Sequence, residues 1–512
     1  MQFTQGLHRA NQLHPNKIAT LCEGRSTTFT ELTTKVAKLA GGLKQRGIPG
    51  GAPVALLGFN SDFYLCYYLA CAWGGFTANP VNFRWNVKEI VYSLNDSKTH
   101  AIILDDNFAH LAEELLASCP ELNQVFYCGD NQIGDIENHI DTLVSQSSPI
   151  EDVGVGGDDL FGIFYTGGTT GFPKGVMLSH KNLCSSALGF MAEGAFPEGC
   201  IGIHVAPMFH LADMSQTVCM LLRGSTHVML PNFSVKGCLE ALALYSVSDL
   251  LLVPTMLQVM INDPSVAQYD LNALERVYYG GSPFTETGLD TTLAVLPGVK
   301  LMQIYGMTES SATISILPWQ EHGAKARAKG RLRSAGRAFP HTQIRIVDNN
   351  DQDRPVGKTG EIIFRSPGVM MGYVNKANET DAALKNGWMH TGDAGFIDLD
   401  GFLYVVDRVK DMIISGGENI YCTEVENAIA SHPAIASVAV FGVPDDEWGE
   451  RVHAALVIKS GSTISYEELV SHCRSSIAGY KCPKSLSLHD ALPLTGAGKI
   501  KKNELRDQIA SQ

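Results

Sequence analysis

Short apolar runs recur between helix-like stretches through most of this 512-residue chain, and this alternation restricts its fold more than any other feature. The runs lie at residues 54–59, 101–104, 161–165, 227–230, 250–253, 276–279 and 301–304. Strands that alternate with helices usually form parallel sheets, because each helix returns the chain to the edge where the next strand begins. The sequence therefore predicts an α/β fold with two layered, mostly parallel subdomains.

The pattern changes near residue 342, where close-set strands predict a small antiparallel β-barrel at 343–347, 360–365, 395–398 and 402–406. After residue 410 the chain restarts as a compact unit of helices near 423–431 and 466–477 and strands near 437–443 and 452–458. The predicted domains are an N-terminal domain at 1–407, a hinge at 408–410 and a small mobile αβ lid at 411–512.

Two helices near the start of the chain can be located individually. Thr28 and Glu31 form a capping box before an apolar stripe of helical period, and Gly47 ends that helix. The long weakly polar run at 63–81 contains glycine, asparagine and proline near its end. It therefore predicts a buried helix that runs into a turn, and not a transmembrane span.

The composition and charge exclude several classes of protein. With 45% hydrophobic residues the chain can bury a large core, so disorder is excluded. The net charge of −14 disfavours a broad nucleic-acid or anionic-membrane surface, so an anionic substrate must be bound by local basic residues. The start has no apolar signal segment, and the twelve cysteines form no C-x-x-C pair. These features predict a reduced, cytoplasmic protein without structural zinc.

The densest chemical signal is the segment Tyr165-Thr-Gly-Gly-Thr-Thr-Gly-Phe-Pro-Lys-Gly175, which follows a predicted strand. Glycines let backbone N–H groups turn toward an anion, while threonine hydroxyls and Lys174 add donors and a positive charge. The alternative is an ordinary surface turn, but such a turn would not need this cluster of glycines, threonines and lysine. The segment is not a Walker A loop, since Phe172 and Pro173 precede the lysine and Gly175 follows it.

This segment resembles the phosphate-binding signature of adenylate-forming enzymes, a family that includes acyl-CoA synthetases, firefly luciferases and the adenylation domains of peptide synthetases. The family usually has serine where this chain has Gly168, and neighbouring threonine hydroxyls are expected to compensate. The resemblance implies ATP-phosphate contacts from Thr166, Gly167, Gly168, Thr169, Thr170, Gly171 and Lys174.

Further motifs of the same family follow in family order. Pro207-Met-Phe-His210 resembles the element whose histidine lies by the acyl pocket, although a histidine in this position is by itself more often a core or capping residue. Gly280-Gly-Ser-Pro283 and Tyr305-Gly-Met-Thr-Glu309 resemble the nucleotide-binding turns. The resemblance implies that Thr308 contacts the α-phosphate and Glu309 binds Mg²⁺. It also implies nucleotide contacts from Gly281, Ser282, Pro283, Tyr305, Gly306 and Met307.

The ribose and lid motifs complete the resemblance. Asp393, in Trp388-Met-His-Thr-Gly-Asp393, is expected to accept both ribose hydroxyls, and Arg408 to contact ribose or phosphate. Lys410 is the expected hinge residue. Lys499, in Leu494-Thr-Gly-Ala-Gly-Lys499, is the expected catalytic lysine of the lid. The neighbouring Lys501 and Lys502 predict a solvated helix face.

Three features favour CoA as the acceptor of the acyl group. Trp448 lies in Asp445-Asp-Glu-Trp-Gly-Glu450, which resembles an element whose tryptophan stacks on CoA adenine; the alternative for Trp448 is a half-buried core residue. Arg84 in Asn82-Phe-Arg84 resembles a CoA-phosphate ligand. Tyr480-Lys-Cys-Pro-Lys484 resembles a second CoA segment, with Cys482 where some relatives have arginine. The implied CoA set is Arg84, Ser415, Gly416, Gly417, Trp448, Tyr480 and Lys484.

The expected acyl pocket is apolar and rich in methionine. By motif position its lining is Met208, Leu211, Ala212, Met214, Thr255, Met256, Tyr279 and Met307. Such a lining suits a medium- to long-chain fatty acid or an aryl or phenylpropanoid monocarboxylic acid. These segments contain no lysine or arginine that could pair with a second carboxylate of the substrate, so a dicarboxylic acid is disfavoured. Asp213 does not fit a plain apolar pocket, and it either faces solvent or accepts a substrate hydroxyl.

The resemblance implies an ATP-dependent acyl-CoA synthetase. A carboxylic acid and ATP give an acyl-adenylate and pyrophosphate, and CoA then gives acyl-CoA and AMP. The implied cofactors are ATP, Mg²⁺ and CoA. The expected partners are small molecules, and no nucleic acid is expected. No transmembrane segment and at most peripheral membrane contact are expected. A homodimer is compatible with the resemblance. A luciferase-like enzyme or a carrier-protein acyl ligase is the alternative, because both share these motifs. A catalytically dead relative would not need Lys499.

Overall fold

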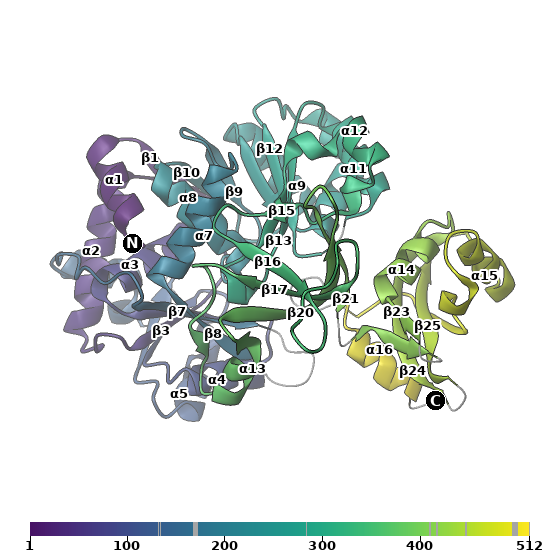
Figure 1. Cartoon of the computed structure of the whole chain (residues 1–512). Helices are drawn as coiled ribbons and strands as arrows, with labels where there is room; N and C mark the ends of the chain where they lie inside the picture. Colours follow the sequence, from purple (N-terminus) through teal and green to yellow (C-terminus); the bar gives the residue numbers. More distant parts are fainter. Residues whose placement is uncertain are drawn as a thin grey trace. The chain divides into compact units, whose positions relative to one another are not determined.

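The computed structural model describes residues 1–131, 133, 135–166, 173–282, 284–408, 411–415, 418–445, 448–493 and 500–510 (Figure 1). The chain folds into two units. The first comprises Met1–Gln343 and Phe364–Met389, and the second Ile344–Ile363 and His390–Gln512. The hinge expected at 408–410 stays a prediction, because Val409 and Lys410 lie outside the described residues.

One sheet of the first unit has the strand order β18-β8-β7-β4-β3-β5-β6. Its strands are β3 (Pro53–Leu57), β4 (Thr77–Pro80), β5 (Ala101–Asp105), β6 (Gln124–Cys128), β7 (Leu160–Thr166), β8 (Lys174–Ser179) and β18 (Gly372–Tyr373). The strands from β7 to β6 pair in parallel, whereas β8 pairs antiparallel to both β7 and β18. The antiparallel strands β7 and β8 therefore flank residues 167–172, which lie outside the described residues.

The other sheet of this unit has the order β15-β14-β13-β12-β11-β9-β10-β1-β2. Its strands are β1 (Ile18–Cys22), β2 (Arg25–Thr28), β9 (Ile201–His204), β10 (Thr226–Met229), β11 (Asp249–Leu252), β12 (Arg276–Gly280), β13 (Lys300–Tyr305), β14 (Ser315–Leu317) and β15 (Arg337–Ala338). The strands from β13 to β1 are parallel. The seven apolar runs of the sequence correspond to β3, β5, β7, β10, β11, β12 and β13, which confirms the predicted α/β layers.

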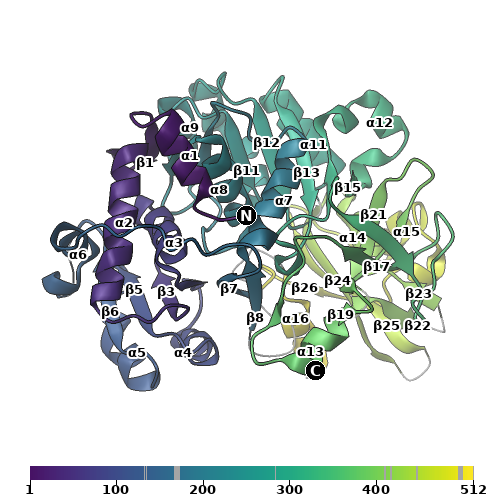
Figure 2. The same cartoon turned by 60° about the vertical axis from the view of Figure 1, so that its left-hand side comes forward.

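Helices cover these sheets in the first unit. They are α1 (Gln5–Leu13), α2 (Phe29–Gln45), α3 (Asp62–Gly74), α4 (Val87–Asp96), α5 (Ala112–Ser118), α6 (Ile140–Gln146), α7 (His180–Ala192), α8 (Leu211–Arg223), α9 (Val235–Leu244), α10 (Pro254–Asn262), α11 (Glu286–Val295), α12 (Ala324–Ala328) and α13 (Ala377–Ala383). The predicted capping box between Thr28 and Glu31 begins α2, and Gly47 beyond its end has a φ of +81°. Helix α2 packs along α3 (Figure 2).

The run at 63–81 folds as expected for its first part. Helix α3 is buried on all sides, so its apolar residues follow no helical stripe. Gly75 ends the helix in the left-handed conformation with a φ of +73°, which confirms the predicted turn. The residues after the turn form β4 in the sheet, which the sequence did not predict. Within the described residues, no helix combines the length and apolar character that a membrane span requires.

The second unit contains most of the barrel strands together with the C-terminal region. The strands predicted as a small barrel form a five-stranded sheet with the order β16-β17-β20-β19, in which β21 also pairs with β20. They are β16 (Gln343–Val347), β17 (Gly360–Arg365), β19 (Leu384–Lys385), β20 (Trp388–Ile397) and β21 (Leu403–Arg408). The C-terminal sheet has the order β23-β22-β25-β24, with β26 paired to β25. It consists of β22 (Ile413–Ser415), β23 (Glu418–Ile420), β24 (Ile435–Asp445), β25 (Gly449–Ile458) and β26 (Ser485–Leu488), with α14 (Cys422–Ala430), α15 (Tyr466–Arg474) and α16 (Lys502–Ala510). The predicted strands and helices of this region are confirmed.

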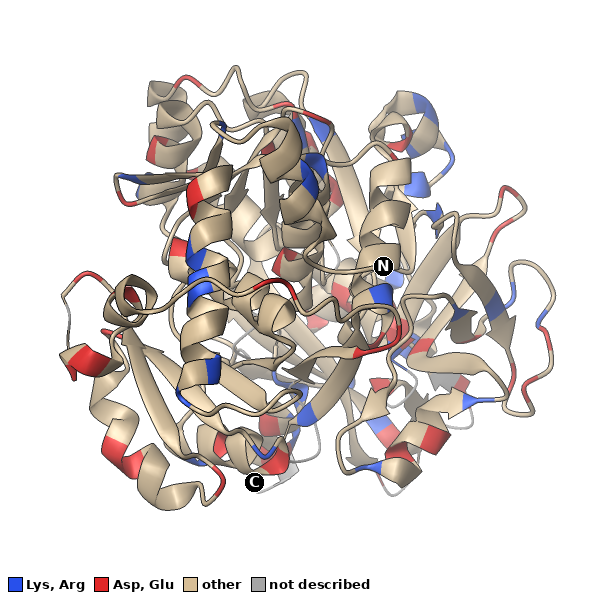
Figure 3. Cartoon of the chain, turned by 90° about the vertical axis from the view of Figure 1, so that its left-hand side faces the viewer, with Lys and Arg blue, Asp and Glu red and all other residues tan. Residues whose placement is uncertain are grey.

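Charged residues of both signs are distributed over the chain. In the view of Figure 3, basic and acidic positions are interspersed along the elements rather than separated. All twelve cysteines are buried free thiols.

Candidate active site

The glycine-rich segment connects two paired strands. Thr166, the last residue of β7, faces Lys174, the first residue of β8, in antiparallel register. The loop between them, with Gly167, Gly168, Thr169, Thr170 and Gly171, lies outside the described residues. The Lys174 Nζ atom lies 4.9 Å from the centroid of the Tyr373 ring. The lysine at the base of the loop is therefore held against an aromatic face.

Glu309 lies in the short 3₁₀ turn η4 (Thr308–Ser310), which follows β13. Ser311 and Ala312 then adopt left-handed backbone conformations with φ of 52° and 76°, which turn the chain sharply. The Glu309 side chain is buried, and its Oε1 atom accepts a 2.7 Å hydrogen bond from the Tyr373 hydroxyl. Tyr373 thus connects Lys174 with Glu309, two residues assigned to ATP from the sequence.

Tyr373 is the residue that the sequence analysis missed here. It follows Gly372 in the two-residue strand β18, which pairs with β8. Its hydroxyl has no local sequence signal, because its partner Glu309 is distant in the chain. Only the pairing of β18 with β8, the strand after the glycine-rich loop, indicates that Tyr373 belongs to the site.

The two motifs that resemble nucleotide-binding turns lie at the ends of neighbouring parallel strands. Strand β12 ends at Gly280, which pairs with Ile304, and Tyr305 ends β13. A Cβ atom at Gly280 would approach the Ile304 carbonyl oxygen to 2.3 Å, so the close strand pairing requires glycine. Gly281 follows with a φ of +81°. Gly281, Ser282, Tyr305, Gly306 and Met307 thus gather at the carboxyl edge of a parallel sheet, where α/β proteins bind ligands, while Pro283 lies outside the described residues.

The expected acyl-pocket residues come from four places in the chain: the start of α8 and the segment before it, helix α10, strand β12 and the residues after β13. His210 is the N-terminal cap residue of this helix. The Met208 carbonyl accepts a 2.8 Å hydrogen bond from the Tyr68 hydroxyl, which fixes the Pro207–His210 segment. Of the predicted lining, the buried residues are Met208, Leu211, Met214 and Tyr279, the half-buried residues are Met256 and Met307, and the exposed residues are Ala212 and Thr255. The Tyr279 hydroxyl lies 2.8 Å from His322 Nε2.

Asp213 does not face solvent, so that part of the sequence-based expectation is wrong. The residue is 1% exposed, and its Oδ1 atom lies 2.8 Å from His204 Nδ1. The other ring nitrogen of His204, Nε2, lies 2.9 Å from His227 Nδ1. Burial lowers the pKa of His227 well below its ordinary value, so the His227 ring at the end of this hydrogen-bonded row is neutral. The physical reason for the difference is that the buried carboxylate has a hydrogen-bonding partner on β9.

In the second unit, the two residues expected to contact the ribose, Asp393 and Arg408, lie on paired strands. Asp393 on β20 is opposite Arg408 on β21, and Arg408 Nε lies 3.2 Å from Asp393 Oδ1. The Asp393 side chain is 14% exposed and the Arg408 side chain 49% exposed. An ion pair at this exposure adds little stability, but it brings a carboxylate and a guanidinium to one place.

Lys502 does not belong to a solvated helix face, which corrects the interpretation from the sequence. Its Nζ atom lies 2.8 Å from Glu426 Oε1, and its side chain is 19% exposed. Burial alone would lower the pKa of Lys502, but the charges of Glu426 and Asp407 raise it above its ordinary value. Helix α16 packs on β24, which turns Lys502 inward. Lys501, the residue before α16, pairs with Glu504 of that helix at 2.7 Å. Lys499 lies outside the described residues.

Trp448 is exposed, so the alternative of a half-buried core residue is wrong. It lies in the turn between β24 and β25 and is 43% exposed. The Lys484 Nζ atom lies 5.1 Å from the centroid of its ring. Ser415 pairs with Gly449, the next residue after Trp448. The structure therefore brings Ser415, Trp448 and Lys484 together at one end of β25.

The other residues assigned to CoA are less closely grouped. Tyr480 is 46% exposed, while Gly416 and Gly417 lie outside the described residues. Cys482 is buried in the core of the C-terminal sheet, so it faces no phosphate. Arg84, in the first unit, lies over the Phe83 ring at 5.4 Å from its centroid. Among the described residues, no carboxylate forms an ion pair with Arg84 or Lys484.

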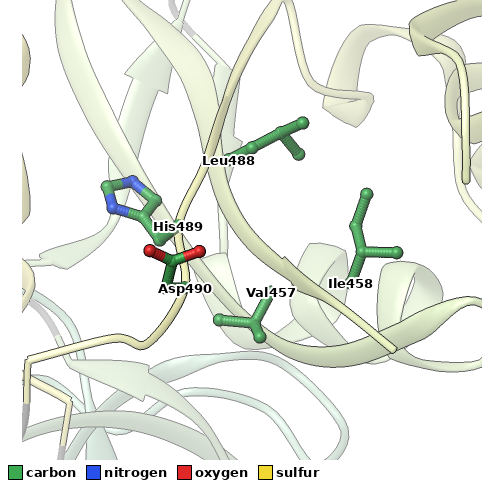
Figure 4. Close-up of a pocket in the computed structure, with 5 residues that line it drawn as sticks. All are labelled: Val457, Ile458, Leu488, His489 and Asp490. Atoms are coloured by element: carbon green, nitrogen blue, oxygen red, sulfur yellow. The ribbon is translucent and has the colours of Figure 1, made fainter. Parts of the chain in front are cut away.

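A pocket in the C-terminal sheet contains none of the predicted site residues. It is lined by Val457, Ile458, Leu488, His489 and Asp490 (Figure 4). His489 Nε2 lies 2.8 Å from the hydroxyl oxygen of Ser487 on β26. One nitrogen of the imidazole ring therefore already has a hydrogen-bonding partner.

Known proteins match this chain over nearly its full length. Residues 7–374 match the family described as AMP-binding enzyme, and residues 424–499 match the AMP-binding enzyme C-terminal domain. A feruloyl-CoA synthase from an Amycolatopsis species is 36% identical over 504 residues, which is 97% of each chain. A fatty acid–[acyl-carrier-protein] ligase from Streptomyces coeruleorubidus is 33% identical over 502 residues, covering 97% of this chain and 94% of the relative.

A solved structure is similar over the same extent. The o-succinylbenzoate CoA synthetase from Bacillus subtilis, in complex with its acyl-adenylate intermediate, superposes with a TM-score of 0.86. Its sequence is 30% identical, and the match covers 98% of both chains. The order of the nucleotide motifs, the two parallel sheets and these matches agree, and the chain belongs to the AMP-binding enzyme family.

Proposed function

We propose that this protein is an AMP-forming acid–CoA ligase, which activates a carboxylic acid with ATP and transfers the acyl group to CoA. The observation that carries the proposal is the grouping of Lys174, Tyr373 and Glu309 at the base of the glycine-rich loop. A positive and a negative side chain beside a loop of this kind suit a bound triphosphate and its metal ion. The family and its CoA-ligase relatives support the same reaction.

In the first step, an oxygen of the substrate carboxylate attacks the α-phosphorus of ATP, and the bond to the bridging oxygen of pyrophosphate breaks. The protein contributes position and charge, and no covalent nucleophile. The backbone N–H groups and hydroxyls of residues 166–171 would hold the phosphates together with Lys174. Thr308 and Lys499 would contact the α-phosphate as its charge is redistributed. Tyr305, Asp393 and Arg408 would orient the nucleoside, and His210 would orient the acid.

Glu309 fits a magnesium ion that arrives with ATP. Its carboxylate is buried in a turn that packs on β8, and among the described residues no lysine or arginine forms an ion pair with it. Within the same residues, no cluster of three or more His, Cys, Asp or Glu side chains could hold a metal by itself. Mg²⁺ commonly binds through one or two carboxylates and the phosphates of its substrate, so a single carboxylate suffices here. The ion would neutralise phosphate charge.

In the second step, the CoA sulfur attacks the acyl carbon of the adenylate, the thiol proton is lost, and AMP leaves. We propose that Trp448 binds the CoA adenine by stacking and that Lys484, Ser415 and Arg84 hold its phosphates. The exposed Trp448 ring with the Lys484 ammonium beside it supports this assignment. Gly416, Gly417 and Tyr480 would complete the surface.

The acid is proposed to be a fatty acid or an aryl monocarboxylic acid. The buried Met208, Leu211 and Met214 provide an apolar lining near His210. Asp213 already contacts His204 and Thr217, so it contributes no free carboxylate to the pocket. The names of two relatives, the feruloyl-CoA synthase and the fatty acid–[acyl-carrier-protein] ligase, support the same two classes. The buried free thiols support a cytoplasmic location.

A carrier protein is the second candidate acceptor, because a relative of 33% identity is named as an acyl-carrier-protein ligase. Such an acceptor would present its thiol on a phosphopantetheine arm and would not offer the adenine ring to Trp448. Free CoA and a phosphopantetheinyl carrier protein, tested in parallel with one acid, separate the two candidates.

We expect carboxylate-dependent exchange of labelled pyrophosphate into ATP in the presence of Mg²⁺. The reason is that adenylation is reversible while the acyl-adenylate stays bound. A panel of fatty and aryl monocarboxylic acids, followed by analysis of nucleotide products, tests this result. Accumulation of ADP instead of AMP with any acid would contradict adenylation, and an acid-independent exchange serves as the background control.

Lys410→Pro should spare adenylation and slow thioester formation. Proline restricts φ to about −65°, so it blocks the backbone rotation that a hinge needs. Single-turnover measurements of acyl-adenylate formation and of acyl transfer to CoA separate the two steps. Lys410→Ala is the matched control, since it removes the side chain and keeps the backbone free. Wild-type rates for both steps in Lys410→Pro would place the hinge elsewhere.

A further inference from the structure

We propose that Tyr373 is a positioning residue that keeps Lys174 and Glu309 apart, so that the lysine stays available to phosphate and the glutamate to Mg²⁺. This inference rests on the proposed function, since it assigns a role inside the same site. Both charged residues lie against one tyrosine side chain. The phenol hydroxyl donates to Glu309 Oε1 at 2.7 Å, and the ring receives Lys174 Nζ at 4.9 Å from its centroid.

The electrostatics of the site explain why a spacer is needed. An ammonium and a carboxylate that share a partly buried site attract each other strongly, because the local dielectric constant is low. A direct ion pair would neutralise both groups and would have to break whenever nucleotide binds. Among the described residues, neither Lys174 nor Glu309 forms an ion pair. The neutral hydroxyl satisfies one oxygen of Glu309 without cancelling its charge.

Backbone hydrogen bonds hold Tyr373 in this position. The segment 366–374 crosses the Glu309 turn, where Met370 N donates to the Glu309 carbonyl oxygen at 2.9 Å. At its other end, Val374 N donates to the Gly175 carbonyl oxygen at 2.9 Å, next to Lys174. Tyr373 is therefore fixed between the metal-binding turn and the strand that leaves the phosphate loop. The residue is 8% exposed, so water competes little for its hydrogen bond to Glu309.

The test separates the hydroxyl from the ring. Tyr373→Phe keeps the aromatic face for Lys174 and removes the donor to Glu309, whereas Tyr373→Leu removes both. ATP affinity is measured by titration calorimetry without any carboxylic acid, once with Mg²⁺ and once with EDTA. We expect Tyr373→Phe to reduce the Mg²⁺-dependent gain in ATP affinity by about ten-fold, the effect of losing one hydrogen bond to a charged group. Its affinity in EDTA should stay at the wild-type value.

Tyr373→Leu should additionally weaken ATP binding in EDTA, because Lys174 would then turn to Glu309. The matched control is Tyr278→Phe, which removes a buried 2.7 Å hydrogen bond from a phenol to Asp249, a carboxylate assigned to neither ATP nor Mg²⁺. It should lower the melting temperature and leave the Mg²⁺ dependence of ATP binding unchanged. Because ATP binding requires no acid substrate, this test gives an answer even if pyrophosphate exchange fails.

A double-mutant cycle with Glu309→Gln tests whether Tyr373 acts through Glu309. The Mg²⁺ dependence of Tyr373→Phe/Glu309→Gln should equal that of Glu309→Gln alone. Additive losses, or a folded Tyr373→Phe protein with wild-type Mg²⁺ dependence, would overturn the proposal. Tyr373→His, which keeps a ring N–H donor, is the second variant if Tyr373→Phe does not fold. Failure of both to fold, shown by circular dichroism, would assign Tyr373 to packing and also overturn it.

Discussion

Lys499→Ala should lower the rate of adenylation by about 10²–10³-fold, the effect of removing one preorganised donor to a developing charge. The family resemblance places this lysine on a glycine-rich turn of the lid, between β26 and α16. Its ammonium would contact the reacting carboxylate and the α-phosphate only during the first step. Acyl transfer from chemically prepared acyl-adenylate to CoA should therefore proceed at close to the wild-type rate.

Lys501→Ala is the matched control for this variant. Lys501 is two residues away, and its Nζ atom pairs with Glu504 at 2.7 Å. Its removal should leave both half-reactions close to wild type, because a partly exposed ion pair contributes little. An equal loss of adenylation and acyl transfer in Lys499→Ala would contradict a lysine that serves one step only. A loss in Lys501→Ala comparable to that in Lys499→Ala would indicate a general disturbance of the C-terminal helix.

Trp448→Ala should raise the KM for CoA by about ten- to a hundred-fold, since stacking of an aromatic ring on a base contributes roughly 1–3 kcal/mol. The ring is 43% exposed, and Lys484 Nζ lies 5.1 Å from its centroid. A flat ligand can therefore stack on the ring while the ammonium binds a phosphate. KM values for ATP and the acid should change little, because their proposed contacts are elsewhere. Steady-state kinetics with each substrate varied in turn measures the three values.

The chain offers a matched control for an exposed tryptophan. Trp319 is 42% exposed, and Lys300 Nζ lies 5.5 Å from its ring centroid. Trp319→Ala should leave the KM for CoA unchanged. Arg84→Ala should cause a further CoA-specific loss that becomes smaller as salt is added. Normal CoA kinetics in Trp448→Ala with a lower melting temperature would contradict the stacking role and would favour a carrier protein as acceptor.

The sequence alone determined the elements whose signals are local. The capping box at Thr28 and the apolar runs predicted α2 and the central strands, because a few adjacent residues decide these structures. The nucleotide motifs likewise predicted the family, since their glycines and charged residues are contiguous in the chain. Strand β4 was missed because its four residues follow a buried helix without a separate pattern.

Only the tertiary structure decided how distant charged residues are paired. Asp213 meets His204 on β9, Lys502 meets Glu426 on α14, and Tyr373 meets Glu309. Each partner comes from a different element, and a charged or polar side chain carries no periodic signal of its partner. Trp448 differs from these residues, because the sequence already favoured an exposed ring that stacks on a ligand. The structure agrees on the exposure, since the ring lies in the turn between β24 and β25 and is 43% exposed. The physical reason is that burial and hydrogen bonding depend on which elements pack together, and that packing joins residues far apart in the chain.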